Sequence, residues 1–309
     1  MASTLTSLPV VGGAGAFRGA SRIVARVALV LLVVLLVLLI AAPGVLAHQS
    51  PIATTSDVIA PPGPAHWFGT DQLGRDVFSR TIFGAQPVLV ASVLGVLVAT
   101  TGGVAFGIAA GSAPRWLNAV LMRVVDVLLA LPVLLIALIL IATVGSGIPS
   151  IVIAIGVAFM PGFARVVETS VRRLRAAEYV QAAQVFGSTR LRTAVRHLLP
   201  NLMTEVVVLA SSAVGWAVLT ATTLSFLGLG VRLPSPDWGS DLAAGASYLS
   251  TSWWLSGFPG LAITLIILLT NFAGDYLMSA LDPRSRRAGR RTLGGMLFGS
   301  WAERGRSTR

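Results

Sequence analysis

Long apolar blocks alternate with shorter polar segments along the chain, and this pattern predicts the architecture. Six blocks are long enough to cross a bilayer as helices, because about 20 apolar residues span its hydrocarbon core. They cover residues 27–47, 87–111, 117–144, 151–167, 206–231 and 258–278. The sequence therefore predicts an all-α, polytopic membrane protein with six transmembrane helices.

The polar segments divide the chain into five regions. We expect a cytoplasmic N-terminal segment at 1–22, a first transmembrane helix at 23–47, an extracytoplasmic segment at 48–86, a core of five transmembrane helices at 87–283 and a basic cytoplasmic tail at 284–309. The first helix also resembles a signal peptide with a cleavage site at Val45-Leu46-Ala47. Its apolar run is long for that role, which favours a retained helix.

The composition excludes several classes of protein. Hydrophobic residues make up 55% of the chain and charged residues 11%, with a mean hydropathy of +0.82. Soluble domains carry about 25% charged residues, so an ordinary soluble enzyme is excluded. The absence of cysteine excludes disulfides and thiolate metal sites. Lysine is absent too, and a P-loop requires one for the nucleotide phosphates, so work driven by ATP needs another subunit.

The charges predict the orientation in the membrane. The net charge is +11, and every basic residue other than histidine is an arginine. All arginines except Arg75, Arg80 and Arg232 lie on one side of the predicted spans, and arginine-rich loops stay in the cytoplasm. We therefore expect both termini to lie in the cytoplasm. Contact with anionic membrane lipid is a secondary expectation, whereas the spread of the arginines over several loops argues against a nucleic-acid partner.

Small residues recur at every fourth position in two blocks, and this spacing predicts close packing between helices. The two stripes are Gly95, Ala99, Gly103, Gly107 and Gly111 in the second block, and Ala213, Ala217, Ala221 and Ser225 in the fifth. Both blocks are candidates for the core of the bundle or for a seam between subunits. In the third block, Pro132 predicts a kink.

Polar residues inside the blocks are candidates for a gate or a pathway. Arg123 and Asp126 lie near the cytoplasmic end of the third block, and Asn271 and Asp275 lie near that of the sixth. Such residues face protein or water rather than lipid, and either local ion pairs that fix helix ends or a cytoplasmic gate would explain them. Candidates for a weakly polar pathway lining are Thr220, Thr222, Thr223 and Ser225. The histidines are scattered, so the sequence predicts neither a catalytic site nor a metal site.

The cytoplasmic segment 176–200 predicts a short basic helix–turn–helix between two membrane spans. Residues 176–186 favour a helix, and Gly187 ends it. Ser188 or Thr189 can cap a second helix, which we expect to stop at Pro200. Such a helix pair either docks in a groove of a partner and transmits its motion, or rests as an amphipathic connector on lipid headgroups.

The run Gln181-Ala182-Ala183, followed by Gly187 and Leu199-Pro200, resembles the EAA motif of ABC importer permeases. In that family the motif forms the coupling helix that inserts into the ATPase subunit. Gln181 stands where the family has glutamate, so no salt bridge is expected there. The resemblance implies an ATPase contact through Gln181, Ala182, Ala183, Val185, Phe186, Gly187, Arg190, Arg192, Leu199 and Pro200.

Further motifs narrow the resemblance to one branch. Residues 66–80, with the run Gly69-Thr70-Asp71, and residues 224–231 resemble signatures of the dipeptide/oligopeptide/nickel permeases, specifically their C-type subunit. The resemblance implies a MetI-like core, a homologous B-type permease, one or two P-loop ATPase subunits that bind ATP and Mg, an extracytoplasmic substrate-binding protein and short peptides as cargo. It also implies the plasma membrane of a bacterium as the location, and no cofactor on this chain.

The charged run before the second block has two interpretations. A helix begun at Thr70 or Asp71 would pair Asp71 with Arg75 and Asp76 with Arg80, each four residues apart. The alternative, implied by the resemblance, is a rim that receives the loaded binding protein. Its candidate residues are Asp71, Arg75, Asp76, Arg80, Asp237 and Trp238.

Two alternative functions stay open at this point. One keeps the architecture and changes the cargo to a nickel chelate, haem or glutathione. The other is a proton-coupled secondary carrier, which would need acidic residues in mid-membrane and usually inverted repeats. The sequence has no clear repeat, and its charged residues lie near the ends of the predicted spans.

Overall fold

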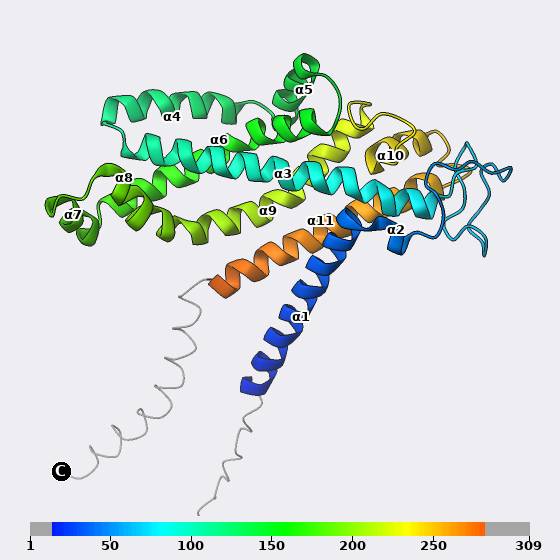
Figure 1. Cartoon of the computed structure of the whole chain (residues 1–309), viewed down its shortest axis with the longest axis horizontal. Coiled ribbons are helices and arrows are strands. Elements are labelled where there is room, and N and C mark those ends of the chain that lie inside the picture. Colours follow the sequence, from blue (N-terminus) through cyan, green and yellow to red (C-terminus); the bar gives the residue numbers. More distant parts are fainter. Residues whose placement is uncertain (1–13, 282–309) are drawn as a thin grey trace, which may run out of the picture.

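The computed structural model describes residues 14–281, where the regular structure is helical apart from one isolated β-bridge between Thr70 and Asp76 (Figure 1). The elements are α1 (Ala14–Ala41), α2 (Pro43–Leu46), α3 (Val77–Ser112), α4 (Arg115–Ala130), α5 (Val133–Val144), α6 (Ile148–Arg175), α7 (Glu178–Val185), α8 (Arg190–Thr193), the π-helical turn η1 (Ala194–Leu198), α9 (Leu199–Phe226), α10 (Trp238–Ala246) and α11 (Trp254–Leu281). The predicted all-α class is confirmed. The predicted segments 1–22 and 284–309 lie wholly or mostly outside the described residues.

Within residues 14–281, four helical stretches are long and apolar enough to cross a membrane. They are Val77–Ser112, Ile148–Arg175, Ala194–Phe226 and Trp254–Tyr276. The helices α4 and α5 meet at an angle of 94°, and they count as a fifth crossing if together they form one broken span. The apolar part of α1, Leu29–Ala41, is shorter. A multi-pass helical membrane protein is therefore supported, while the count of six spans stays a prediction.

The break between α4 and α5 lies at the predicted proline. Leu131 adopts an extended conformation with ψ of 140°, because a residue before proline is driven out of the helical region. Pro132 then precedes α5. The predicted kink is thus a bend of 94° that divides the block into two helices. Figure 1 shows α4 running alongside α3 and α6, with α5 turned away from it.

The predicted close packing of the first small-residue stripe is confirmed. A Cβ atom added at Gly103 would lie 2.4 Å from the Phe163 Cβ, and one added at Gly107 would lie 2.7 Å from the Val167 Cβ. Glycine therefore lets the α3 backbone meet α6 at a distance that no other residue permits. Ala217 and Ala221 of the second stripe are buried in the same core cluster.

The start of α3 differs from the prediction. The helix begins at Val77, well before residue 87, and Pro87 lies inside it. The Asp76 side chain accepts a hydrogen bond from the Ser79 backbone N–H and so fixes this earlier start. Polar residues such as Arg80 and Gln86 excluded this stretch from the predicted span. In the structure it is the start of the same helix, and most of its residues are buried in protein.

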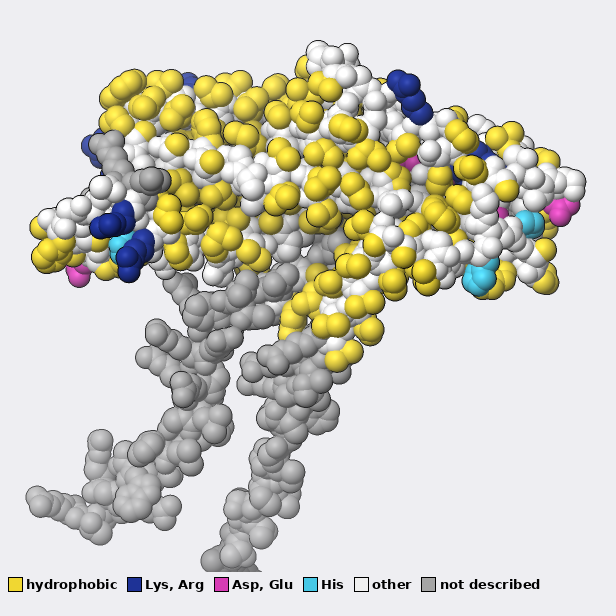
Figure 2. Space-filling view, viewed as in Figure 1, with side chains coloured by type: hydrophobic (Ala, Val, Ile, Leu, Met, Phe, Trp, Pro, Cys, Tyr) yellow, Lys and Arg dark blue, Asp and Glu magenta, His cyan; other side chains and the backbone are white. Residues whose placement is uncertain are grey.

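The described chain has two polar ends joined by an apolar flank. One end carries α7 and α8, and we name it the arginine-rich end; the other carries α10 and the loop of residues 47–76, and we name it the loop end (Figure 1). Figure 2 shows hydrophobic side chains covering the flank between these ends. This distribution fits a membrane around the middle of the bundle.

Candidate functional site

The segment 176–200 at the arginine-rich end, named the elbow, connects α6 to α9. Gly187 has a φ of +84°, a left-handed conformation that favours glycine. The residues around it close the end of α7, because Phe186 N–H donates to the Ala182 carbonyl and Ser188 N–H to the Ala183 carbonyl, both at 3.0 Å. The predicted helix break at Gly187 is therefore confirmed.

The second arm of the elbow departs from the prediction. Thr189 caps it, since its Oγ1 accepts a hydrogen bond from Arg192 N–H at 3.3 Å. The arm does not stop at Pro200 but continues through η1 into α9, with Leu199 N–H bonded to the Ala194 carbonyl. The predicted stop was wrong because a π-helical turn widens the backbone just before the proline. The missing N–H and the bulk of the ring of Pro200 are thereby accommodated.

The elbow combines buried anchors with an exposed apolar tip. Val180 and Leu198 are fully buried, and they hold the elbow against the helical bundle. By contrast, Val185 and Phe186 are 85% and 90% exposed. Among the other predicted contact residues, the exposed ones are Gln181, Ala182, Gly187, Arg192 and Pro200, and the half-buried ones are Ala183 and Leu199. The side chain of Arg190 lies outside the described part of the elbow.

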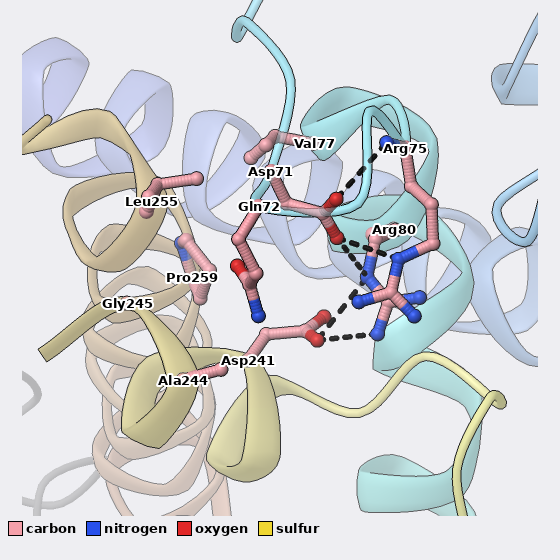
Figure 3. A pocket seen from close by; sticks show the side chains of 10 residues that line it. All are labelled: Asp71, Gln72, Arg75, Val77, Arg80, Asp241, Ala244, Gly245, Leu255 and Pro259. Atoms are coloured by element: carbon pink, nitrogen blue, oxygen red, sulfur yellow. Dashed lines mark hydrogen bonds and ion pairs between the residues drawn. The ribbon is translucent and has the colours of Figure 1, made fainter. Parts of the chain in front are cut away.

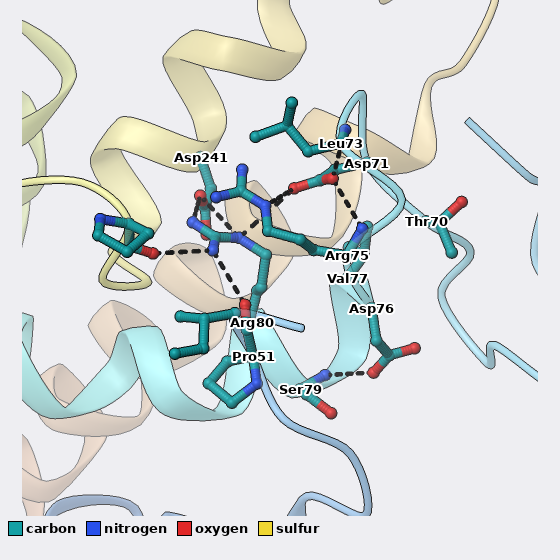
Figure 4. A network of polar contacts seen from close by, with 12 residues as sticks. Pro51, Thr70, Asp71, Leu73, Arg75, Asp76, Val77, Ser79, Arg80 and Asp241 are labelled. Carbon is teal, nitrogen blue, oxygen red and sulfur yellow. Dashed lines mark hydrogen bonds and ion pairs between the residues drawn. The ribbon is translucent and has the colours of Figure 1, made fainter. Parts of the chain in front are cut away.

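At the loop end, Arg80 binds segments that are distant in sequence (Figure 3). Its guanidinium is paired with Asp241 of α10 and donates to the Pro51 carbonyl at 3.1 Å and the Pro234 carbonyl at 3.3 Å. Asp71 joins this group, with its Oδ2 2.6 Å from Arg75 Nε and 3.8 Å from Arg80 Nε. The four residues Asp71, Arg75, Arg80 and Asp241, named the charge cluster, are almost completely enclosed (Figure 4).

The predicted helix from Thr70 to Arg80 was wrong in its first half. Gly69 and Gly74 have φ values of +75° and +72°, so the backbone turns instead of extending a helix. The Asp71 carboxylate stabilises this turn by accepting hydrogen bonds from Leu73 N–H at 2.8 Å and Arg75 N–H at 2.9 Å. Its predicted pairing with Arg75 is confirmed, but within a turn.

The predicted pair between Asp76 and Arg80 was wrong as well. Asp76 is occupied as the cap of α3, and its Oδ1 also lies 3.0 Å from His66 Nδ1. Arg80 turns to Asp241, which lies far away in sequence and so escapes a search for neighbouring charges. A buried arginine needs a carboxylate of this kind, because an unpaired buried charge is costly.

Asp237 and Trp238 also lie inside the loop end. Asp237 caps α10 by accepting from Gly239 N–H at 2.9 Å and Ser240 N–H at 3.1 Å, and Trp238 Nε1 donates to the Thr81 carbonyl at 2.6 Å. Burial raises the pKa of Asp237. Burial likewise raises the pKa of Asp241, although Arg80 opposes that rise. These buried residues stabilise the shape of the loop end and leave contact with any partner to the loops around them.

The four hydroxyl candidates for a pathway lining do not share one environment. Thr222 and Ser225 are buried within the chain, and Ser225 Oγ donates to Asp237 at 3.2 Å. Thr220 and Thr223 are half-buried and bond back to carbonyls of their own helix at 2.9 and 2.7 Å. The hypothesis of a pathway lining therefore depends on Thr220 and Thr223.

The gate candidates are arranged differently from a local pair. Asp126 binds Arg165 of α6 at 2.5 Å rather than Arg123, so the expected local ion pair was wrong. Arg123 is exposed on α4. On α11, Asn271 and Asp275 are exposed, and Asn271 lies beside Gly215 of α9.

The sequence interpretation missed a buried polar contact near the elbow. Glu168 of α6 is 4% exposed and accepts a hydrogen bond from Asn118 Nδ2 of α4 at 2.8 Å. Arg172 lies 3.5 Å from the same carboxylate. The spacing of Glu168 and Arg172, four apart on a helix, could have indicated this ion pair. No pattern in the sequence indicates the contact with Asn118 of α4.

Comparisons with known proteins agree with this architecture. The family described as the binding-protein-dependent transport system inner membrane component matches residues 103–287. A putative peptide transport system permease protein of Brucella abortus is 41% identical over 230 residues, which cover 74% of this chain and 77% of the relative. The dipeptide transport system permease protein DppC of Alkalihalophilus pseudofirmus is 37% identical over 225 residues, covering 73% and 74%. The glutathione transport system permease protein GsiD of Pectobacterium atrosepticum is 39% identical over 223 residues, covering 72% and 74%. The matched region contains the elbow and three of the four long helical stretches. The chain belongs to the family of binding-protein-dependent inner membrane transport components, with a MetI-like fold.

Proposed function

We propose that this chain is the permease subunit of an ATP-driven importer for short peptides. The observation that carries the proposal is the elbow: a short helical projection held between two long helices, with Val185 and Phe186 exposed at its tip. Solvent exposure of two large apolar side chains side by side favours a protein contact. Family membership supports an ATPase subunit as the partner in that contact.

The remaining parts of the machine belong to the same proposal. A homologous second permease completes the pathway, one or two P-loop ATPase subunits bind ATP and Mg, and a binding protein delivers cargo to the loop end. The arginine-rich end faces the cytoplasm, in agreement with the positive-inside rule, and six spans place both termini there. The ATPase activity belongs to those partner subunits, because the lysine of a P-loop is absent from the sequence of this chain.

Peptide cargo is supported by the relatives of this chain, which include a putative peptide permease and a dipeptide permease. Glutathione is a specific second candidate, since one relative of similar identity transports it. Competition for uptake of a labelled dipeptide by excess glutathione or by unlabelled di- to tetrapeptides separates the two cargoes.

The docking role is tested by changing the tip of the elbow. We expect Val185→Ser combined with Phe186→Ser to reduce co-purification of the ATPase about tenfold or more, because burying one such side chain contributes about 1.5–3 kcal/mol. Uptake of labelled peptide should fall with it. Val58→Ser, a change of the same kind at an exposed position far from the elbow, is the matched control and should preserve co-purification of the ATPase. Unchanged co-purification and uptake in the double variant would contradict the proposal.

A further inference from the structure

A cavity of about 280 Å³ opens at the arginine-rich end, where α3 ends, α4 begins and α6 ends. Its polar lining residues are Arg115, Asn118, Arg172 and Arg175, and the small residues Gly111, Ala113 and Ala176 complete it. We name it the arginine cavity. Its volume is close to the lower end of the range for small-molecule sites, about 300–1,000 Å³. The elbow residues with exposed apolar side chains, Val185 and Phe186, do not belong to this lining.

The lining of the arginine cavity favours an anion. It contains three arginines and no acidic residue. The carboxylate of Glu168 lies 3.5 Å from Arg172 and neutralises part of this charge, but Glu168 is itself buried and bonded to Asn118. Arg175 donates to the Gly111 carbonyl at 3.2 Å, which holds its guanidinium at the cavity. A surplus of positive charge remains toward the opening.

The start of α4 adds donors to the same place. Pro114 precedes this 16-residue helix and offers no side-chain cap, so the first backbone N–H groups of the helix are not bonded to a capping side chain. Helix N-termini attract anions through these N–H groups and through the helix dipole. Arginine forks and a helix start together suit the oxygens of a phosphate group.

The position of the cavity relative to the membrane indicates which molecule carries that phosphate. Trp116, directly after Arg115, is 69% exposed, and tryptophan is enriched where a membrane meets water. Val120, Val124 and Val127 are also exposed and continue on the same face of α4. The cavity therefore opens at the level where an apolar, lipid-facing surface begins. Basic pockets between transmembrane helices at this level bind headgroups of acidic lipids.

We propose that the arginine cavity binds the phosphate of an anionic phospholipid through Arg115, Arg172 and Arg175. The acyl chains then lie along the valine face of α4. The lipid joins α3, α4 and α6 at the point where α6 leads into the elbow.

Native mass spectrometry of the full chain in detergent tests the proposal. Phosphatidylglycerol and phosphatidylcholine with identical acyl chains are added at increasing concentration, and bound molecules are counted. We expect one phosphatidylglycerol to bind at least about tenfold more tightly than phosphatidylcholine. Arg115→Gln combined with Arg175→Gln should reduce that affinity about tenfold or more, since each hydrogen bond to a charged group contributes on this scale. Equal affinity for the two lipids, or unchanged affinity in this variant, would overturn the proposal.

Matched variants separate binding from folding and from general charge. Arg196→Gln removes an exposed arginine of the same end that does not line the cavity, and it should bind phosphatidylglycerol like the unaltered chain. Arg115→Lys combined with Arg175→Lys retains the charge and should recover most of the affinity. Loss of phosphatidylglycerol binding in Arg196→Gln would show that binding depends only on the overall positive charge of this end, and would overturn the proposed site.

Two further measurements distinguish other sources of the anion. Thermal unfolding with inorganic phosphate alone tests a soluble ligand, and stabilisation equal to that by phosphatidylglycerol would overturn the lipid assignment. A photoreactive phenylalanine analogue in place of Trp116, activated in native membranes, should label phospholipid. Labelling of a protein subunit instead would assign the cavity to a protein interface and overturn the proposal.

Discussion

The contact between α3 and α6 allows a sharp test, because two neighbouring glycines experience it differently. A Cβ atom at Gly103 would lie 2.4 Å from the Phe163 Cβ, 2.9 Å from the Met160 carbonyl oxygen and 3.1 Å from the Ala164 nitrogen. A Cβ atom at Gly102 would meet only the Met160 side chain, with its Sδ at 3.2 Å. Gly103→Ala and Gly102→Ala are thus the same chemical change at adjacent positions of one helix.

The structure determines the magnitude of the difference. At Gly103 the obstacles are backbone atoms and a Cβ, which move only if the two helices separate by about 1 Å, and overpacking of this kind costs about 1–3 kcal/mol. At Gly102 the obstacle is the end of a methionine, whose three rotatable bonds let it adapt. Both variants gain the same helix propensity of alanine over glycine, about 0.8–1 kcal/mol. The difference between them therefore isolates the helix contact.

Thermal unfolding of the two variants in detergent, followed by the loss of the monodisperse peak in size-exclusion chromatography, measures this difference. We expect Gly103→Ala to unfold about 2–10 °C below Gly102→Ala, since about 1 kcal/mol corresponds to a few degrees in a chain of this size. Equal midpoints for the two variants would refute the reasoning, because the helices would then have room that the structure does not contain.

Two other changes test the loop end. Arg80→Gln leaves Asp241 buried without its cation and should lower the stability of the folded chain by about 3–5 kcal/mol; a midpoint equal to that of the unaltered chain in the same unfolding assay would contradict the role of the charge cluster. Asp237→Asn retains an oxygen that can cap α10 but cannot ionise. Because burial raises the pKa of Asp237 above 3.8, its stabilising contribution is complete below the unfolded-chain pKa and is lost as the pH rises through the raised folded-state value. The unaltered chain should therefore gain stability relative to Asp237→Asn as the pH falls from 7 toward 4, and a constant or opposite difference between their unfolding midpoints would contradict this sign.

Features that depend on local chemistry could be predicted from the sequence. The break at Gly187 follows from the conformation that glycine permits, and the break at Pro132 follows from the restriction that proline places on Leu131. The glycine stripe of α3 was predictable for a related reason, since small residues at every fourth position leave one face of a helix open to close approach. In each case the residue itself carries the physical cause.

Features that depend on distant partners could not be predicted in this way. The side chain of Arg80 finds Asp241 across 161 positions of sequence, and Asp126 finds Arg165 on another helix. A search for opposite charges three or four residues apart assigns both to neighbours instead. The early start of α3 was missed for a similar reason. Polar residues among 77–86 exclude this stretch from a predicted membrane span, whereas in the structure it is largely buried, and Trp238 of the distant α10 bonds to the Thr81 carbonyl.

The way the elbow packs against the bundle connects the arginine-rich end mechanically to the loop end. The first arm of the elbow, α7, follows α6 after a turn at residues 176–177, and its second arm continues through η1 into α9. Val167 and Val171 of α6 pack with Leu198 of η1 and Leu202 of α9 in one apolar cluster. A force on the elbow therefore moves α6 and α9 together, because neither helix can slide along the other without opening that cluster. The glycines of α3 leave no space against α6, so the displacement passes to α3. This helix has 36 residues and spans about 54 Å, ending in Arg80 and the charge cluster. If an ATPase binds the elbow as proposed, the loop end will respond to it through packed backbone rather than through a flexible linker, and loosening the α3–α6 contact should reduce peptide uptake even where ATPase binding is intact.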